Sequence, residues 1–306
     1  MFSLVIPTHN RASILERSLA HLFKLDELAG CEVIVVNDGS TDRTGRMLDD
    51  LQRAHPQLLR VFQITNGGPG RARNRGVQEA TKKHILFIDD DVFPRPGMIN
   101  SHRQMLEQGY TGSQGLLLWH PEIAITPLIR YLDARGTQFA FDHIKNAAQL
   151  GFPFVYTGNF AVEKDAVLKA GGFDETFFNE RHGFSAYEDT ILGYQLLKNG
   201  AKLGLNRSAV ADHLHDMTED GCLRREYKVG YAAGLLTEKY PEIARQLGHQ
   251  RKKYLPQFQL RLMRLLNWSG ASAKFLGYEF GLRLRHREAF YRGFFEYRCR
   301  TVPAQQ

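Results

Sequence analysis

The stretch Leu86-Phe87-Ile88-Asp89-Asp90-Asp91 joins an apolar run to three adjacent carboxylates. The pattern predicts a buried strand over His84–Ile88 that ends where the acidic run begins. Burying three neighbouring negative charges costs free energy unless a cation lies beside them. Carboxylate oxygens suit a hard divalent cation, Mg²⁺ or Mn²⁺, which would bridge to a phosphorylated substrate. The alternative is a solvated acidic turn after an edge strand.

Three further apolar strands precede this one, and helical patterns separate them. The strands cover Phe2–Ile6, Glu32–Val36 and Leu59–Ile64, and a helix ending near Ala80 precedes the fourth strand. Alternating strands and helices with short connections predict an α/β fold with a Rossmann-like, doubly wound, mostly parallel sheet. Ligands bind at the carboxyl edge of such a sheet, and polar or small residues follow all four strands.

The ends of the four strands carry four motifs in a fixed order. They are Val5-Ile6-Pro7-Thr8-His9-Asn10-Arg11, Asn37-Asp38-Gly39-Ser40-Thr41-Asp42, Asn66-x-Gly68-x-x-x-Ala72-Arg73-Asn74-x-Gly76 and Asp89-Asp90-Asp91. Together they closely resemble the motifs of the family 2 glycosyltransferases, which are inverting enzymes with the GT-A fold. The resemblance covers roughly residues 3–215. It implies a nucleoside diphosphate sugar as donor, with UDP-sugars favoured, and a hydroxyl group as acceptor.

The resemblance implies a role for each motif. Thr8 and Asp38 would line the base pocket, where the Asp38 carboxylate would accept a hydrogen bond from the uracil N3–H. Arg73 would lie near the nucleotide, and the glycines before it would let the backbone approach the ligand closely. The implied donor-binding residues are Pro7, Thr8, Asn10, Asp38, Gly68, Arg73, Asp89 and Asp90. Taken alone, Asp38 could simply shape its turn, and Arg73 could lie on a helix surface.

Asp91 is the implied metal ligand, together with Asp89, which would also face the ribose. Asp90 could share the metal-binding role, and the sequence does not rank Asp90 against Asp91. His213 and His215 follow a predicted strand at Ala209–Ala211, where many family members place a metal-binding histidine. If that strand continues, both histidines point to the same face and either would serve, although a structural role is the alternative. The implied cofactor is Mn²⁺ or Mg²⁺, which would neutralise the leaving diphosphate.

Thr157-Gly158-Asn159 interrupts a predicted strand over residues 154–162, and the resemblance places this segment beside the donor sugar and the acceptor. Inverting transfer needs a base that takes the proton of the acceptor hydroxyl. The resemblance assigns that role to Asp189 of the Glu188-Asp189 pair, and a place in the first helical turn favours the ionised form. The alternative is that the pair only charges a helix start. A tryptophan often precedes the pair in the family, whereas this chain has Ser185-Ala186-Tyr187, which leaves the acceptor open.

Basic charge is concentrated at the end of the chain, because residues 251–306 hold 12 Lys/Arg and 3 Asp/Glu. We expect a catalytic domain over residues 1–220, with a nucleotide-sugar-binding half (1–115) and an acceptor half (116–220), and a basic, aromatic-rich helical extension over 221–306. A helix is predicted over Arg224–Tyr240 and an apolar stripe over Phe258–Leu266. The aromatics of the extension either pack on the catalytic domain or contact an anionic membrane, and membrane contact would suit a lipid-linked acceptor.

Composition narrows the class further. The chain is 43% apolar, and none of its apolar runs approaches the roughly 20 residues that span a bilayer. Three separated cysteines and an N-terminus unlike a signal peptide predict a cytoplasmic protein, peripheral on the membrane at most. A nucleic-acid partner is not expected, because it would leave the acidic run unexplained. The alternatives kept are a non-catalytic nucleotide-sugar-binding relative and a sugar nucleotidyltransferase, although the latter would carry a Gly-rich loop in place of Pro7–Asn10.

Overall fold

The computed structural model describes residues 1–135, 139–180, 183–249 and 277–301. The predicted stripe over Phe258–Leu266 lies outside these residues. The chain divides into two compact units: unit 1 comprises residues 1–124, 135–180 and 188–216, and unit 2 comprises residues 125–134, 181–187 and 217–306. Both expected halves of the catalytic domain fall mainly in unit 1. In addition to the extension, unit 2 contains two segments from within the expected catalytic domain, residues 125–134 and 181–187.

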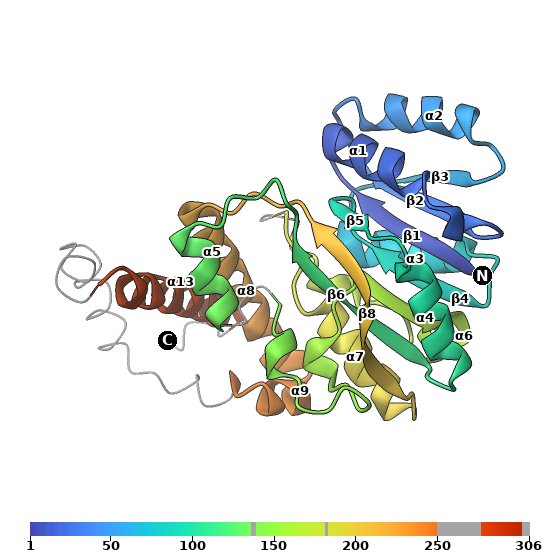
Figure 1. The fold of residues 1–306 in the computed structure, drawn as a ribbon. Coiled ribbons are helices and arrows are strands. Elements are labelled where there is room, and N and C mark those ends of the chain that lie inside the picture. Colours follow the sequence, from blue (N-terminus) through green and yellow to red (C-terminus); the bar gives the residue numbers. More distant parts are fainter. Residues whose placement is uncertain (136–138, 181–182, 250–276, 302–306) are drawn as a thin grey trace. The chain divides into compact units, whose positions relative to one another are not determined.

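Unit 1 is built on one twisted sheet (Figure 1). Its strands are β1 (Phe2–Thr8), β2 (Glu32–Asp38), β3 (Leu59–Ile64), β4 (His84–Ile88), β5 (Val92–Pro94), β6 (Gly112–Trp119), β7 (Asn159–Glu163) and β8 (Leu203–His213). They lie in the order β3-β2-β1-β4-β7-β6-β8-β5.

The first four strands confirm the predicted doubly wound half, since β3, β2, β1 and β4 are parallel neighbours. β1 is buried along its whole length because it lies between β2 and β4, which explains its continuous apolar run. The rest of the sheet is mixed: β7 is antiparallel to both of its neighbours, and β5 is antiparallel to β8. The strand predicted over residues 154–162 begins only at Asn159, and the one predicted at Ala209–Ala211 is the much longer β8.

Helices connect the strands and complete the two units. They are α1 (Ala12–Leu22), α2 (Thr44–Ala54), α3 (Gly68–Glu79), α4 (Met98–Glu107), α5 (Pro127–Arg135), α6 (Lys164–Lys169), α7 (Glu188–Lys198), α8 (Glu219–Lys239), α9 (Pro241–Gln246) and α13 (Tyr278–Thr301). Short 3-10 helices cover Asp26–Leu28, Phe141–His143, Phe152–Phe154 and Glu175–Phe177. α3 packs on β1 and β2, whereas α4 packs on β6 and β8. Both helices thereby bury one face each against the sheet.

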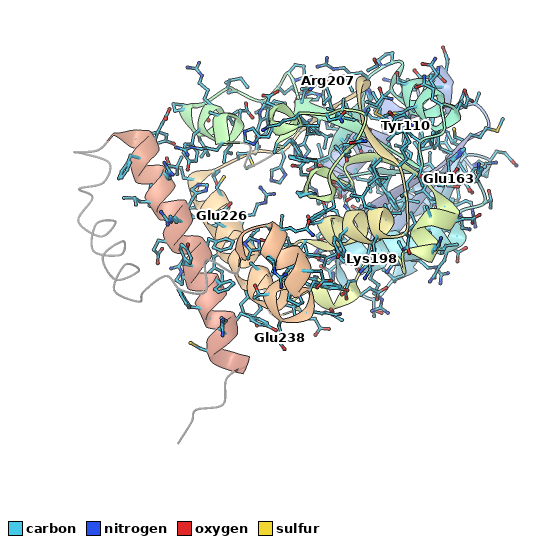
Figure 2. All side chains as sticks on the ribbon, turned by 90° about the horizontal axis from the view of Figure 1, so that it is seen from below. Tyr110, Glu163, Lys198, Arg207, Glu226 and Glu238 are labelled. Carbon is cyan, nitrogen blue, oxygen red and sulfur yellow. The ribbon has the colours of Figure 1, made fainter. Side chains whose placement is uncertain are left out.

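Unit 2 is organised around the contact between α8, which matches the predicted helix over Arg224–Tyr240, and α13. Phe290 and Phe294 of α13 are buried in a cluster with Ala233 of α8. Glu238 lies near the end of α8 (Figure 2). Its carboxylate accepts a hydrogen bond from the Tyr297 hydroxyl of α13 at 2.9 Å. In the described part of the extension, Phe290, Phe294 and Tyr297 therefore take part in the packing of α13 against α8. Among the described helices, none combines the length and the apolar character needed to cross a membrane.

Two glycines allow the backbones of α8 and α13 to touch. A Cβ atom on Gly293 would lie 1.9 Å from the Tyr227 carbonyl oxygen, and one on Gly230 would lie 1.9 Å from that of Phe290. Replacing Gly293 by alanine is expected to lower the free energy of unfolding by about 2 kcal/mol, because the two helices must separate. Urea denaturation checks this. Gly45→Ala is the matched control: the nearest atom to a Cβ there is at 3.6 Å, so the change should be neutral or stabilising.

Candidate active site

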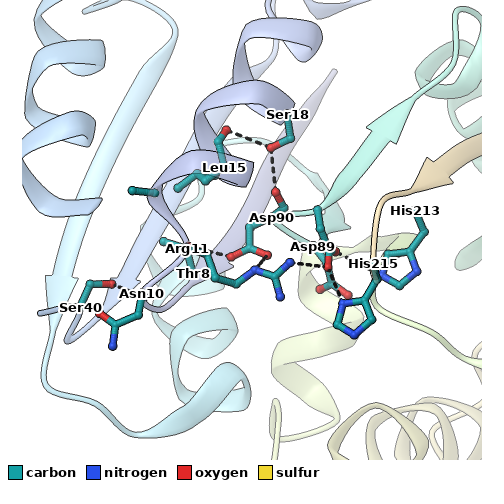
Figure 3. A network of polar contacts seen from close by, with 12 residues as sticks. Thr8, Asn10, Arg11, Leu15, Ser18, Ser40, Asp89, Asp90, His213 and His215 are labelled. Atoms are coloured by element: carbon teal, nitrogen blue, oxygen red, sulfur yellow. Dashed lines mark hydrogen bonds and ion pairs between the residues drawn. The ribbon is translucent and has the colours of Figure 1, made fainter. Parts of the chain in front are cut away.

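Asp90 follows β4 and is anchored by the neighbouring strand β1 (Figure 3). The register pairs Val5 with Phe87, so the end of β1 lies beside the acidic run. Thr8 donates to Asp90 Oδ2 at 2.7 Å, and Arg11 Nε lies 3.1 Å from Asp90 Oδ1. Burial raises the pKa of Asp90, while Arg11 opposes that shift. Protein groups thus hold both carboxylate oxygens of Asp90.

Asp91 is surrounded by cationic or potentially cationic groups. Arg11 Nη2 lies 2.6 Å from Asp91 Oδ2, His215 Nδ1 lies 3.2 Å from the same oxygen, and His213 Nε2 lies 3.3 Å from Oδ1. Burial favours the protonated acid, but His213, His215 and Arg11 together hold the pKa of Asp91 far below its usual range. The neighbours of Asp91 therefore hold its carboxylate in the ionised form.

The donor atoms of Asp91, His213 and His215 lie within 4.8 Å of one another. They meet because β5, which starts directly after Asp91, pairs Val92 with His213 of β8. The two imidazole rings are stacked at 5.4 Å with an interplanar angle of 2°. One carboxylate oxygen and two imidazole nitrogens fit a divalent metal ion. Both predicted histidines are thus brought to Asp91, whereas Asp89 does not belong to this group.

Asp89 instead pairs with a buried arginine. Arg73 Nη2 donates to Asp89 Oδ1 at 2.7 Å, and Nη1 lies 3.6 Å from Glu188 Oε1. The Arg73 side chain is only 6% exposed, so it does not lie on a helix surface. Within the described residues, Nε and Nη1 of Arg73 have no hydrogen-bond acceptor. The buried Arg73 guanidinium therefore links Asp89, which follows β4, to Glu188 at the start of α7, and it has N–H groups left over to bind a ligand.

Asp189 stands beside Glu188 at the start of α7. It is partly exposed, and its Oδ1 accepts the backbone N–H of Thr190 at 2.7 Å. The surrounding protein, and then the charge of Glu188, raise the pKa of Asp189, which Arg73 lowers only in part. The expectation that the helix start makes Asp189 a stronger acid was wrong in direction, because desolvation outweighs the helix dipole. A raised pKa makes the carboxylate a better proton acceptor.

Asp38, the last residue of β2, binds the backbone of the loop between β3 and α3. Its two oxygens accept the backbone N–H groups of Gly67 and Gly68, each at 2.8 Å. Burial raises the pKa of Asp38, while these hydrogen bonds oppose that shift. Gly68 has a φ of +85°, and a Cβ there would lie 2.4 Å from Phe178, so the position requires glycine. Asp38 does shape this loop. Its Oδ2 also accepts from Asn66 Nδ2 at 3.2 Å, so Oδ1 is the oxygen that keeps a lone pair for a base.

The remaining predicted donor residues lie at the same edge. Pro7 is buried in β1, opposite Val36 of β2. Asn10 is exposed, with a φ of +53°, and its Oδ1 accepts from the backbone N–H groups of Thr41 at 2.7 Å and Asp42 at 3.2 Å. Asn10 therefore ties the loop after β1 to the loop after β2.

The predicted acceptor segment divides into two parts. A Cβ on Gly158 would lie 3.0 Å from Asp89 Oδ2, so the backbone here approaches the acidic run. Thr157 is buried beside it. Asn159 is fully buried, and its side chain donates to the Leu116 carbonyl and lies 2.8 Å from His102 Nε2. The structure therefore gives the Asn159 side chain a place in the sheet core.

Three residues at this edge were absent from the predicted site. Arg11 contacts both Asp90 and Asp91, and His9 Nδ1 lies 2.7 Å from the Asp38 carbonyl oxygen. Asn66 donates to that same carbonyl at 3.0 Å. The sequence could have indicated all three, because each lies within three residues of the carboxyl end of β1 or β3, and the carboxyl ends of the parallel strands meet at one edge.

Several known proteins are similar to this chain in sequence. The model of the family described as glycosyl transferase family 2 matches residues 3–169, more than half of the chain. The chain is 25% identical over 276 residues to the chondroitin synthase of Escherichia coli, a match that covers 80% of this chain and 39% of that protein. It is 26% identical over 256 residues to the pre-mycofactocin glycosyltransferase of Mycobacterium tuberculosis, covering 78% and 48%. The chain thus spans less than half the length of these relatives.

Solved structures confirm the GT-A fold. A mannosyltransferase from Pyrobaculum calidifontis, in complex with GDP-Man and Mn²⁺, superposes with a TM-score of 0.67 at 15% identity, covering 98% of this chain and 88% of the other. TarS 1-349 from S. aureus, in complex with UDP-GlcNAc, gives a TM-score of 0.55 at 18% identity, covering 97% and 91%. With the family match over residues 3–169, the chain belongs to glycosyl transferase family 2.

Proposed function

We propose that the chain is a metal-dependent, inverting glycosyltransferase that moves a sugar from a UDP-sugar to a hydroxyl acceptor in polysaccharide or other glycoconjugate synthesis. One observation carries the proposal. Arg73 joins Asp89, two residues from the candidate metal ligand Asp91, to Glu188, the neighbour of the candidate base. Arg73 thereby connects the residues proposed to bind the leaving diphosphate and its metal ion with the residues proposed to activate the acceptor hydroxyl.

The proposed reaction assigns a proton acceptor and a diphosphate site. The acceptor oxygen attacks the anomeric carbon from the face opposite the diphosphate, whose bond to that carbon breaks as the new bond forms. Asp189 takes the hydroxyl proton, a role that its raised pKa supports. The spare N–H groups of buried Arg73 suit the oxygen atoms of a diphosphate, which would satisfy them.

Asp91, His213 and His215 would hold the metal, which when bound would neutralise charge on the departing diphosphate. Mg²⁺ strongly prefers oxygen ligands, whereas two of these three donors are imidazole nitrogens. We therefore favour Mn²⁺ over Mg²⁺ as the working ion. The mannosyltransferase and TarS complexes named above contain GDP-Man and UDP-GlcNAc respectively, so the base of the donor requires a direct test.

The test is release of nucleotide from UDP-, GDP- and dTDP-sugars with Mn²⁺, with Mg²⁺ and with a chelator. Metal-dependent release of UDP from one sugar would support the proposal and identify the donor. Tight metal-dependent binding of UDP without turnover would indicate that the acceptor is missing. If neither binding nor turnover occurs with any donor, the proposal is wrong.

We also propose that an exposed face of α13 contacts an anionic membrane, where a lipid-linked acceptor would lie. Phe280, Arg283 and Arg287 are exposed at helical spacing, which combines an aromatic ring with two positive charges. Replacing both arginines by serine should weaken binding to phosphatidylserine vesicles at low salt by about 2 kcal/mol. The control replaces two exposed arginines of unit 1, Arg46 and Arg207, which changes the net charge equally. Equal loss in both variants would contradict a specific face.

A further inference from the structure

Arg11 reaches the candidate metal ligand Asp91 from the loop after β1 (Figure 3). Its Nη2 donates to Asp91 Oδ2 at 2.6 Å, and the same oxygen lies 3.2 Å from His215 Nδ1. The other oxygen, Oδ1, lies 3.3 Å from His213 Nε2. All four residues belong to unit 1. Both oxygens of Asp91 are therefore in contact with neighbouring side chains, and of these three contacts that of Arg11 is the shortest.

The three groups around Asp91 differ in what they can do when a metal ion binds. An imidazole ring that has lost its proton becomes a metal ligand through the free nitrogen. A guanidinium group has no lone pair to offer and stays charged in proteins. Burial lowers the pKa of Arg11, but Asp90 and Asp91 more than offset this effect, so Arg11 remains a cation. Of the three groups, Arg11 alone cannot become a ligand, and it therefore competes with a metal ion for Asp91.

The hold of Asp90 on Arg11 is looser than that of Asp91. Arg11 Nε lies 3.1 Å from Asp90 Oδ1, but among the described residues this buried nitrogen has no hydrogen-bond acceptor. The Arg11 side chain is 35% exposed, so it has room to move. Leaving Asp91 would free Nη2 as a second donor beside Nε. Two adjacent N–H groups of a guanidinium suit the oxygen atoms of a phosphate group.

We propose that Arg11 competes with the metal ion for Asp91 and, once displaced, binds the diphosphate of the donor. The second step rests on the proposed function, because it needs a nucleoside diphosphate at this edge of the sheet. Arg11 would thereby weaken the binding of metal alone and strengthen the binding of nucleotide when metal is present. Metal and nucleotide would each raise the affinity of the protein for the other, by the same factor.

The first test is the Kd for Mn²⁺ alone, followed by its paramagnetic resonance signal in the full chain. At a separation of about 5 Å, repulsion between a dication and a guanidinium corresponds to about a tenfold change in affinity or more, even at the dielectric constant of water. Arg11→Gln should therefore bind Mn²⁺ at least about tenfold more tightly than the unchanged protein. Arg11→Lys, which keeps the charge, should bind it nearly as weakly as the unchanged protein does.

Arg17→Gln is the matched control, because Arg17 lies on α1, is exposed and pairs with Glu122 at 2.7 Å. This variant changes the net charge equally and should leave the Kd for Mn²⁺ unchanged. Equal tightening in Arg11→Gln and Arg17→Gln would reveal a general effect of charge and would overturn the proposal. Unchanged or weaker binding in Arg11→Gln would overturn it as well. If none of the proteins binds Mn²⁺, the metal site is wrong and the proposal falls with it.

Melting temperatures give a second measurement of the competition, and they also show whether each variant is folded. In chelator, Arg11→Gln should melt below the unchanged protein, because Asp91 loses a hydrogen bond and a positive neighbour. Saturating Mn²⁺ should narrow this difference, since the tighter-binding variant gains more stability from the metal. A difference that Mn²⁺ leaves unchanged would mean that Arg11 and the metal act independently, which contradicts the proposal.

The diphosphate step is tested by the Kd for UDP in Mn²⁺ and in chelator. In the unchanged protein Mn²⁺ should raise the affinity for UDP, and in Arg11→Gln this gain should be at least about tenfold smaller, because a charge-assisted contact is lost. An equal gain in both proteins would overturn this step. If UDP binds to neither protein, the proposed function fails and the diphosphate step with it, whereas Mn²⁺ alone still decides whether Arg11 competes for Asp91.

Discussion

Asp189→Asn is expected to lower kcat for sugar transfer by at least about 10³-fold while UDP binds as tightly as to the unchanged protein. The substitution keeps the size of the side chain but removes the only proton acceptor that the proposed mechanism uses. Turnover with the donor found in the panel gives kcat, and calorimetric titration gives the Kd for UDP. Loss of both would mean that Asp189 maintains the site instead of acting in the reaction.

The control for this variant is Asp165→Asn. Asp165 lies in the first turn of α6 and is exposed, so it supplies the same charge to a helix start without a place at the sheet edge. Asp165→Asn should leave kcat unchanged. A similar loss in both variants would favour the alternative that the acidic pair only charges its helix.

The pH dependence provides an independent check on the same carboxylate. Burial and then Glu188 raise the pKa of Asp189 to about 7. The base must be ionised to accept a proton, so kcat should rise with pH through this region and fall below it. This acidic limb of the plot of kcat against pH should lie well above pH 4, where an ordinary carboxylate titrates. In Asp189→Asn, kcat should no longer show this limb.

Asp91→Asn is expected to weaken Mn²⁺ binding by at least about a hundredfold and to abolish metal-dependent turnover. Asp91 is the only carboxylate among the three donor residues, so its loss leaves two imidazoles and no negatively charged ligand to bind a dication. Binding of Mn²⁺ can be followed by its paramagnetic resonance signal in the absence of any sugar nucleotide.

Asp212→Asn is the matched control for Asp91→Asn. Asp212 lies next to His213 on β8, but its carboxylate pairs with Arg95 at 2.7 Å. It should bind Mn²⁺ as the unchanged protein does. If both variants retain binding, the metal is held elsewhere and the assignment of Asp91, His213 and His215 is wrong.

The part of the site predicted best is the part made by parallel strands. Each of β1, β2 and β4 has a clear apolar pattern, and parallel strands deliver their next residues to one edge. This reasoning placed Asp38 and Asp91 at that edge from local patterns alone. The same reasoning should have added Arg11, which lies in the loop after β1 and pairs with Asp90 and Asp91. Arg11 therefore balances part of the charge of the acidic run, in addition to any metal ion held by Asp91, His213 and His215.

The rest of the site depends on contacts between residues far apart in the sequence, which local sequence patterns cannot predict. β5 has only three residues, and its pairing with β8 decides that both histidines reach Asp91. The burial of Asn159 follows from β7 lying between β4 and β6, an antiparallel insertion that the strand–helix alternation did not indicate. The raised pKa of Asp189 likewise depends on tertiary burial, which the helix-start pattern alone cannot reveal.

The pairing of β5 with β8 also ties metal affinity to the course of folding. Asp91 and His215 are 124 positions apart, so the three donors cannot meet until the long segment between them has closed and β5 has paired with β8. Contacts between distant residues form late, because a long loop must close first. A metal ion that binds only the completed sheet stabilises it by mass action, by about 2.7 kcal/mol at a concentration one hundred times the Kd. Metal binding should therefore be the last kinetic phase of refolding, and the chelated protein should melt at a lower temperature.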